Sequence, residues 1–191
     1  MPFSAHSQSN PELPYAEIPA AAQVYTAGTV ISRLIDGLGF RYYWATEGLT
    51  EENLAYRPSP EARSLSETLD HIYGLSETVV NAPQNIANVR PADWSGLTFE
   101  EKRKGTLENL SKASELIKNG SEGDMENYSI IFKAGDNTSA FPYWNMINGP
   151  IADALYHTGQ VVSFRRSAGN PIPVGVNVFM GTRRQPPETQ R

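Results

Sequence analysis

Residues 148–168, NGPIADALYHTGQVVSFRRSA, determine the architecture that we expect for this chain. Their apolar residues recur at the three- and four-residue spacing of one helix face. Asn148 is suited to cap the start of this helix, with Pro150 in its first turn, and Gly-Asn-Pro at 169–171 should end it. The stretch therefore predicts an amphipathic helix with an apolar face formed by Ile151, Ala154, Val161, Val162, Phe164 and Ala168.

Three further helices are predicted upstream, over residues 20–47, 64–81 and 98–118, from the same helical spacing. Ser-x-x-Glu at 64–67 and Thr-x-x-Glu at 98–101 match the capping box that begins many helices. Residues 121–147 are compatible with either a short hairpin or a long loop. Four helices with connections of varied length favour an all-α four-helix bundle.

The length of 191 residues suits one domain, which we place at residues 20–181. Residues 1–19 contain four prolines and little periodic pattern, and residues 182–191 are polar, so we expect a disordered N-terminal arm and a polar C-terminal tail. The net charge of -5 and the scattered basic residues argue against nucleic acid as a partner.

The absence of cysteine excludes disulfides, zinc–thiolate sites and a cysteine nucleophile. No apolar run approaches the ~20 residues that a membrane span needs, so no membrane association is expected. No signal peptide is recognisable, and the expected location is therefore cytoplasmic.

Two of the three histidines, His71 and His157, lie on predicted helices, whereas His6 lies in the arm and is discounted. Asp153 precedes His157 by four residues, which places both side chains on one helix face. Two imidazoles and a carboxylate suit a divalent metal and leave positions open for water or substrate. The spacing also fits a histidine that is hydrogen-bonded to Asp153 with no metal, and from the residues alone both interpretations stay open.

Several neighbours are candidates for supporting roles. Gln160 lies one turn beyond His157 and could orient a ligand or a water molecule. Arg165 and Arg166 are interpreted as a solvated pair that favours the negative end of its own helix. Tyr42, Tyr43 and Trp44 are assigned to the bundle core. The residues proposed as pocket walls are Tyr73, Trp144 and Phe164.

Two segments resemble the DinB-like family. LDHI at 69–72, preceded by SLSE at 64–67, resembles the second-helix signature of that family, and YHTGQVV followed by Arg-Arg and Gly at 156–169 resembles its last-helix signature. The resemblance spans roughly residues 20–181. It implies a four-helix bundle with a long crossover connection and a metal held by three ligands, usually histidines. His71 and His157 match two of these ligands, while Asp153 stands where the family has the third histidine.

The resemblance also implies a reaction class. Characterised DinB-like proteins include transferases and isomerases that act with low-molecular-weight thiols, so the expected function is a metal-dependent transferase or hydrolase acting on a small electrophilic molecule. The metal would be Ni, Zn, Mn or Fe, and the sequence names no catalytic residue besides the ligands. A homodimer through the bundle faces is a candidate assembly that the sequence does not decide. The alternative is a non-catalytic, stress-associated binding protein with a degenerate metal site.

Overall fold

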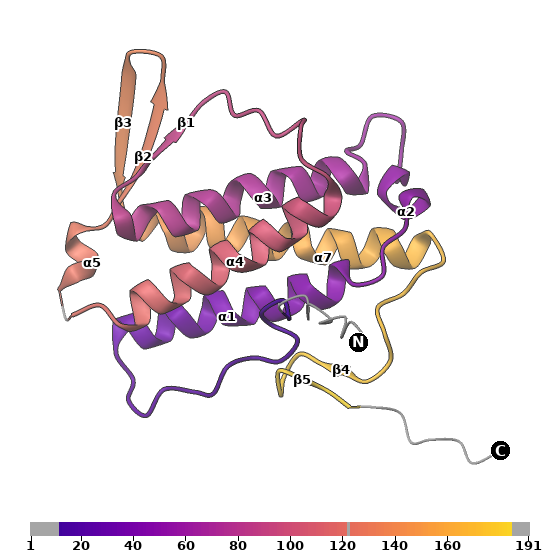
Figure 1. The fold of residues 1–191 in the computed structure, drawn as a ribbon, viewed down its shortest axis with the longest axis horizontal. Coiled ribbons are helices and arrows are strands. Elements are labelled where there is room, and N and C mark those ends of the chain that lie inside the picture. Colours follow the sequence, from indigo (N-terminus) through magenta and orange to yellow (C-terminus); the bar gives the residue numbers. More distant parts are fainter. Residues whose placement is uncertain (1–11, 122, 185–191) are drawn as a thin grey trace, which may run out of the picture.

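The computed structural model describes residues 12–121 and 123–184 and is mostly helical (Figure 1). Four long helices dominate it: α1 (Ala27–Thr46), α3 (Leu65–Asn81), α4 (Phe99–Lys118) and α7 (Ala152–Ser167). Both α1 and α3 pack against α4 and against α7. Helix α1 therefore lies diagonally opposite α3, and α4 lies diagonally opposite α7.

The helices begin where side chains satisfy their first backbone N–H groups. In α3, the Glu67 N–H donates to Ser64 Oγ at 3.0 Å, and the Ser64 N–H donates to Glu67 Oε2 at 2.8 Å. Thr98 and Glu101 form the same reciprocal pair in front of α4. The two capping boxes predicted from the sequence are confirmed. The first helix begins seven residues later than predicted, because Thr26 forms a capping box at that point.

The core lies between the four helices. Its fully buried side chains include members of all four helices, so each helix contributes one apolar face. Tyr42 and Trp44 are buried as predicted, and Tyr43 is partly buried against the core. Representative core residues are Ile35, Leu38, Leu65, Ile72, Leu107, Leu110 and Val161.

A small sheet stands at one end of the helices (Figure 1). Strand β2 (Ser129–Ala134) pairs antiparallel with β3 (Asn137–Pro142) and parallel with β1 (Ala87–Val89). Of the two conformations compatible with residues 121–147, the hairpin is therefore the one that forms. The preceding short helix α5 (Asp124–Asn127) links α4 to this hairpin.

Shorter elements complete the chain. They are α2 (Glu51–Ala55), η1 (Ala82–Gln84), β4 (Val176–Asn177) and β5 (Thr182–Arg183). Strands β4 and β5 form a two-stranded hairpin across the predicted domain end at residue 181, so β5 lies in the expected polar tail. No helix within residues 12–121 and 123–184 combines the length and the apolar character needed to cross a membrane.

The entry into α7 differs from the prediction. Asn148 does not cap this helix, because the chain is already helical in α6 (Trp144–Met146) and passes through a π-helical turn, η2 (Ile147–Ile151). Pro150 has no N–H to donate, and Gly149 takes φ −98° and ψ −107°, outside the helical region. Such turns insert an extra residue into a helix and are frequent next to functional sites. Here the turn lies directly before Asp153.

Part of the expected disordered N-terminal arm is structured. Residues 12–19 lie against α1, where the Tyr15 hydroxyl donates to Asp36 Oδ1 at 3.0 Å and Trp44 Nε1 donates to the Ala16 carbonyl at 3.1 Å. The Tyr15 ring occupies the space that a side chain at Gly39 would fill, and Tyr15 is therefore buried. This tertiary contact orders a proline-rich segment that local sequence alone marks as disordered. Residues 1–11, with His6, and residues 185–191 lie outside the described part.

Candidate metal centre

The three predicted ligands come together between α3 and α7. His71 Nε2 lies 3.0 Å from Asp153 Oδ2, and His157 Nε2 lies 3.3 Å from Asp153 Oδ1. The two imidazole rings are 4.7 Å apart and nearly perpendicular. One ligand atom from each residue lies within 4.8 Å of the others, so the group could hold a metal ion.

Local structure explains this convergence. Asp153 stands in the first turn of α7, directly after the π-helical turn, and His157 follows one helical turn later on the same face. His71 projects from the middle of α3, which packs against α7. The site therefore depends on one helix pair and one local spacing. The spacing of Asp153 and His157 is visible in the sequence, whereas the position of His71 next to them depends on how α3 packs against α7.

The group is open on one side. The His157 side chain is 12% exposed, whereas those of His71 and Asp153 are 35% and 41% exposed. The inner histidine is thus anchored in the helix packing, and the other two donors face solvent. An ion bound here would keep positions accessible to water or to a small molecule.

Gln160 fixes the orientation of His157. Its Oε1 lies 2.7 Å from His157 Nδ1, and its Nε2 donates to the Tyr156 hydroxyl at 3.3 Å. When the amide oxygen accepts from Nδ1–H of a neutral imidazole, the lone pair is on Nε2, which lies 3.3 Å from Asp153 Oδ1. Metal-ligating histidines are commonly held this way through their other nitrogen.

The sequence did not lead us to predict a role for Tyr156 at this site. Its ring lies 5.2 Å from that of His157, and its hydroxyl accepts the Gln160 hydrogen bond. The four-residue spacing between Tyr156 and Gln160 is the signal that could have identified the pair.

The three residues proposed as pocket walls have aromatic or helix neighbours of their own. Tyr73 packs on Trp94, with ring centroids 5.6 Å apart, and lies against Gly105 of α4. The ring centroids of Phe164 and Tyr56 lie 5.9 Å apart. Trp144 is 77% exposed and lies beside α1. Among residues 12–121 and 123–184, no hydrogen bond, ion pair or aromatic pair joins these side chains to the His–Asp–His group.

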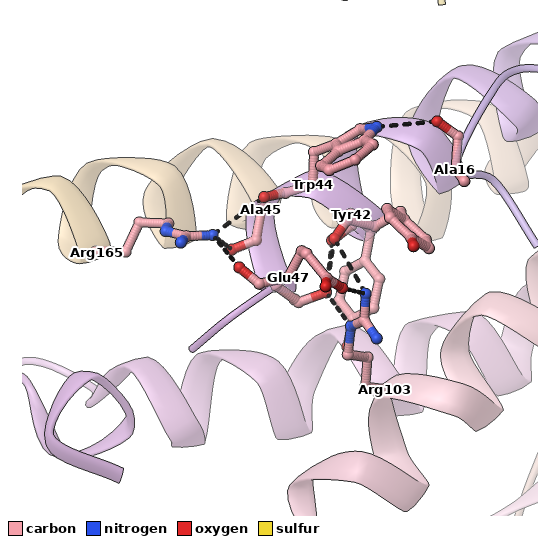
Figure 2. A network of polar contacts seen from close by, with 9 residues as sticks. Ala16, Tyr42, Trp44, Ala45, Glu47, Arg103 and Arg165 are labelled. Atoms are coloured by element: carbon pink, nitrogen blue, oxygen red, sulfur yellow. Dashed lines mark hydrogen bonds and ion pairs between the residues drawn. The ribbon is translucent and has the colours of Figure 1, made fainter. Parts of the chain in front are cut away.

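Arg165 overturns a second expectation. Its side chain is 1% exposed, and its Nη1 donates to the carbonyls of Trp44, Ala45 and Glu47 at 3.0–3.1 Å (Figure 2). Burial lowers the pKa of this guanidinium. Arg165 therefore caps the end of α1 rather than its own helix, because α1 ends against α7; Arg166 is exposed as expected.

Arg103 approaches the same end of α1 from α4 (Figure 2). Its Nε donates to Thr46 Oγ1 at 2.9 Å, and its guanidinium pairs with the Glu47 carboxylate. Two cations from two helices thus satisfy the negative end of α1. In this cluster, the guanidinium groups of Arg103 and Arg165 both have hydrogen-bond acceptors, and it is separate from the His–Asp–His group.

Comparison with known proteins yields no relative: no family model, no curated protein and no solved structure matches this chain.

Proposed function

We propose that this protein is a metal-dependent enzyme of the DinB-like type, with a divalent ion held by His71, Asp153 and His157. The observation that carries the proposal is the convergence of both Nε2 atoms on one carboxylate, 3.0 and 3.3 Å from its two oxygens. Metal–nitrogen bonds of about 2.0–2.1 Å hold neighbouring ligands roughly 3 Å apart, so these side chains need little movement to share an ion.

The hydrogen-bond pattern supports a cation between the ligands. When Gln160 Oε1 accepts from Nδ1–H of a neutral His157, the lone pair of Nε2 faces the oxygen lone pairs of Asp153. Two acceptors in contact repel each other unless a proton or a metal ion lies between them. Two imidazoles with one carboxylate form a donor set that suits Ni, Zn, Mn or Fe.

The proposed fold is a four-helix bundle with a long crossover connection. Support comes from the packing of α1 and α3 on both α4 and α7, which puts α4 and α7 at opposite corners. The chain between them, residues 119–151, is long enough to cross the end of the assembly and also forms the β2–β3 hairpin.

The proposed reaction is transfer to, or hydrolysis of, a small electrophilic molecule. A bound divalent ion would lower the pKa of a coordinated water or thiol and so supply a nucleophile near neutral pH. Gln160 hydrogen-bonds to His157 Nδ1 and to the Tyr156 hydroxyl, which leaves His157 Nε2 facing the proposed ion. The exposed sides of His71 and Asp153 leave the approach open to a low-molecular-weight thiol and to its acceptor.

The test is elemental analysis of purified protein reconstituted with Ni, Zn, Mn or Fe, alongside His71→Ala and Asp153→Ala. We expect about one equivalent of one metal in the wild type and a loss of that metal in both variants. Asp136→Ala in the exposed β2–β3 turn removes a carboxylate elsewhere and should retain the metal. The loaded protein is then assayed with low-molecular-weight thiols and an electrophilic acceptor.

A second candidate is a non-catalytic binding protein with a degenerate site. It is favoured by the position of Asp153, whose two oxygens can accept hydrogen bonds from both histidines when the imidazoles present N–H groups. In that case no metal is retained or taken up, and adding metals leaves the melting temperature unchanged.

A further inference from the structure

An apolar groove lies where the start of α1 meets α5 and the entry to α6, and Figure 1 shows α5 at the same end of the helices as the start of α1. Its volume is about 520 Å³, which is within the range of sites that enclose a small organic molecule. Among the described residues, its lining includes none of the three proposed metal ligands, so the groove is distinct from the metal centre. Its principal lining residues are Tyr25, Val30, Met125, Glu126, Trp144 and Ile147.

The charge of the groove is negative. Among the described residues that line it, Glu126 is the only charged one, and its side chain is exposed. Within residues 12–121 and 123–184, Glu126 forms no ion pair. An unpaired carboxylate at the edge of apolar surface attracts a cation more strongly than bulk water allows, because the apolar surface lowers the local dielectric constant. The groove is therefore complementary to a cationic ligand.

The aromatic residues of the groove favour the same charge. Tyr25 is 96% exposed and Trp144 is 77% exposed, so both present large apolar surfaces to solvent. The face of an aromatic ring attracts an ammonium group, and the indole ring of tryptophan does so most strongly. A ligand that is positively charged and partly apolar would match both the rings and the carboxylate.

A comparison of the three tryptophans shows how Trp144 differs. The guanidinium of Arg183 lies 5.0 Å from the ring centroid of Trp44, and that of Arg90 lies 5.9 Å from the ring centroid of Trp94. In the part of the chain that the structure describes, no such cation lies over the ring of Trp144. The chain thus supplies a cation to two tryptophans, and the ring of the third is open to a cation from solution.

We propose that this groove binds a small organic cation, in which an ammonium or quaternary ammonium group is attached to an aryl or alkyl body. The cationic group would lie between Glu126 and the ring of Trp144, and the body would cover Val30 and Ile147. Affinity then comes from the cation–π contact, from the ion pair and from the apolar area that the body removes from water. The inference goes beyond the proposed metal-dependent reaction and does not depend on it.

The test is isothermal titration calorimetry of the full chain with benzyltrimethylammonium. Two comparison ligands share its aromatic body: benzyldimethylamine N-oxide, which has no net charge, and 3-phenylpropanoate, which is an anion. We expect the cation to bind at least about 10-fold more tightly than the N-oxide, as a desolvated cation–π contact predicts, and the anion to bind least. Equal binding of the cation and the N-oxide, or tighter binding of the anion, would overturn the proposal.

Two substitutions locate the binding site. Glu126→Gln removes the charge at nearly constant shape, and Trp144→Leu removes the ring but keeps an apolar side chain. Each should weaken binding of benzyltrimethylammonium about 5-fold or more. The matched controls are Glu100→Gln and Phe179→Leu, which alter an exposed glutamate and an exposed aromatic residue outside the groove and should bind as the wild type does.

Circular dichroism checks that all four variants are folded. Wild-type affinity in both Glu126→Gln and Trp144→Leu would contradict the assignment of the cation to this groove. Absence of binding to the wild type at millimolar benzyltrimethylammonium would do the same.

Discussion

The two ends of α7 carry charged and polar side chains that differ in burial and in hydrogen bonding. At its C-terminal end, all three nitrogens of the buried Arg165 guanidinium donate to backbone or side-chain oxygens. At its N-terminal end, Asp153 is partly open to solvent together with His71, and the Nε2 atoms of His71 and of the more buried His157 both lie within 3.3 Å of its carboxylate. A satisfied, buried cluster stabilises a fold, whereas a partly exposed cluster of convergent ligand atoms is a candidate site for a metal ion.

The largest effect is expected at the satisfied end. Arg165→Met should lower the free energy of unfolding by about 3–5 kcal/mol, because it removes the Arg165 donor from two buried carbonyls and one part-buried carbonyl at the end of α1. Chemical denaturation of the metal-free protein measures this change. Arg166→Met, at the exposed neighbour, should stay within about 0.5 kcal/mol of the wild type. Equal effects of the two substitutions would remove the distinction between the ends.

At the N-terminal end of α7, a substitution should affect metal binding more than stability. His157→Ala is expected to weaken metal binding at least about 100-fold, more than the loss of a residue that only supports a ligand. The metal-free variant should lose less stability than Arg165→Met. Thermal melts with and without metal give both quantities, because a ligand at 100 times its Kd stabilises the wild type by about 2.7 kcal/mol. A variant that is still stabilised by metal would contradict the ligand assignment.

Sequence reasoning succeeded where the information is local. The capping boxes before α3 and α4 and the spacing of Asp153 and His157 each lie within one or two turns of chain, and all of them are present in the structure. The role of Arg165 was not readable, because the carbonyls that it binds lie about 120 residues earlier. Tyr15 was assigned to a disordered arm for the same reason, since its burial depends on the space at Gly39.

Asp153→His tests what the aspartate contributes. The substitution gives the three-histidine pattern of the DinB-like family that the sequence resembles and removes one negative charge from the site. We expect relative affinity to shift from Mn toward Ni and Zn, since imidazole suits these metals better than a carboxylate does. Competition between the metals, read by elemental analysis, measures the shift. An unchanged preference would mean that Asp153 acts by holding the histidines and not by ligating.

The smallest effect is expected one contact away from the proposed ion. Gln160→Leu removes the acceptor at His157 Nδ1 and should weaken metal binding about 10–100-fold, because the ring is then free to turn and to change tautomer. Gln160→Glu keeps an acceptor at that atom and should retain most of the affinity. Removing the Tyr156 hydroxyl with Tyr156→Phe keeps the ring against His157 and should change the affinity less than Gln160→Leu does. If Gln160→Leu and Gln160→Glu weaken binding equally, the amide acts through packing and not through the hydrogen bond that orients the imidazole.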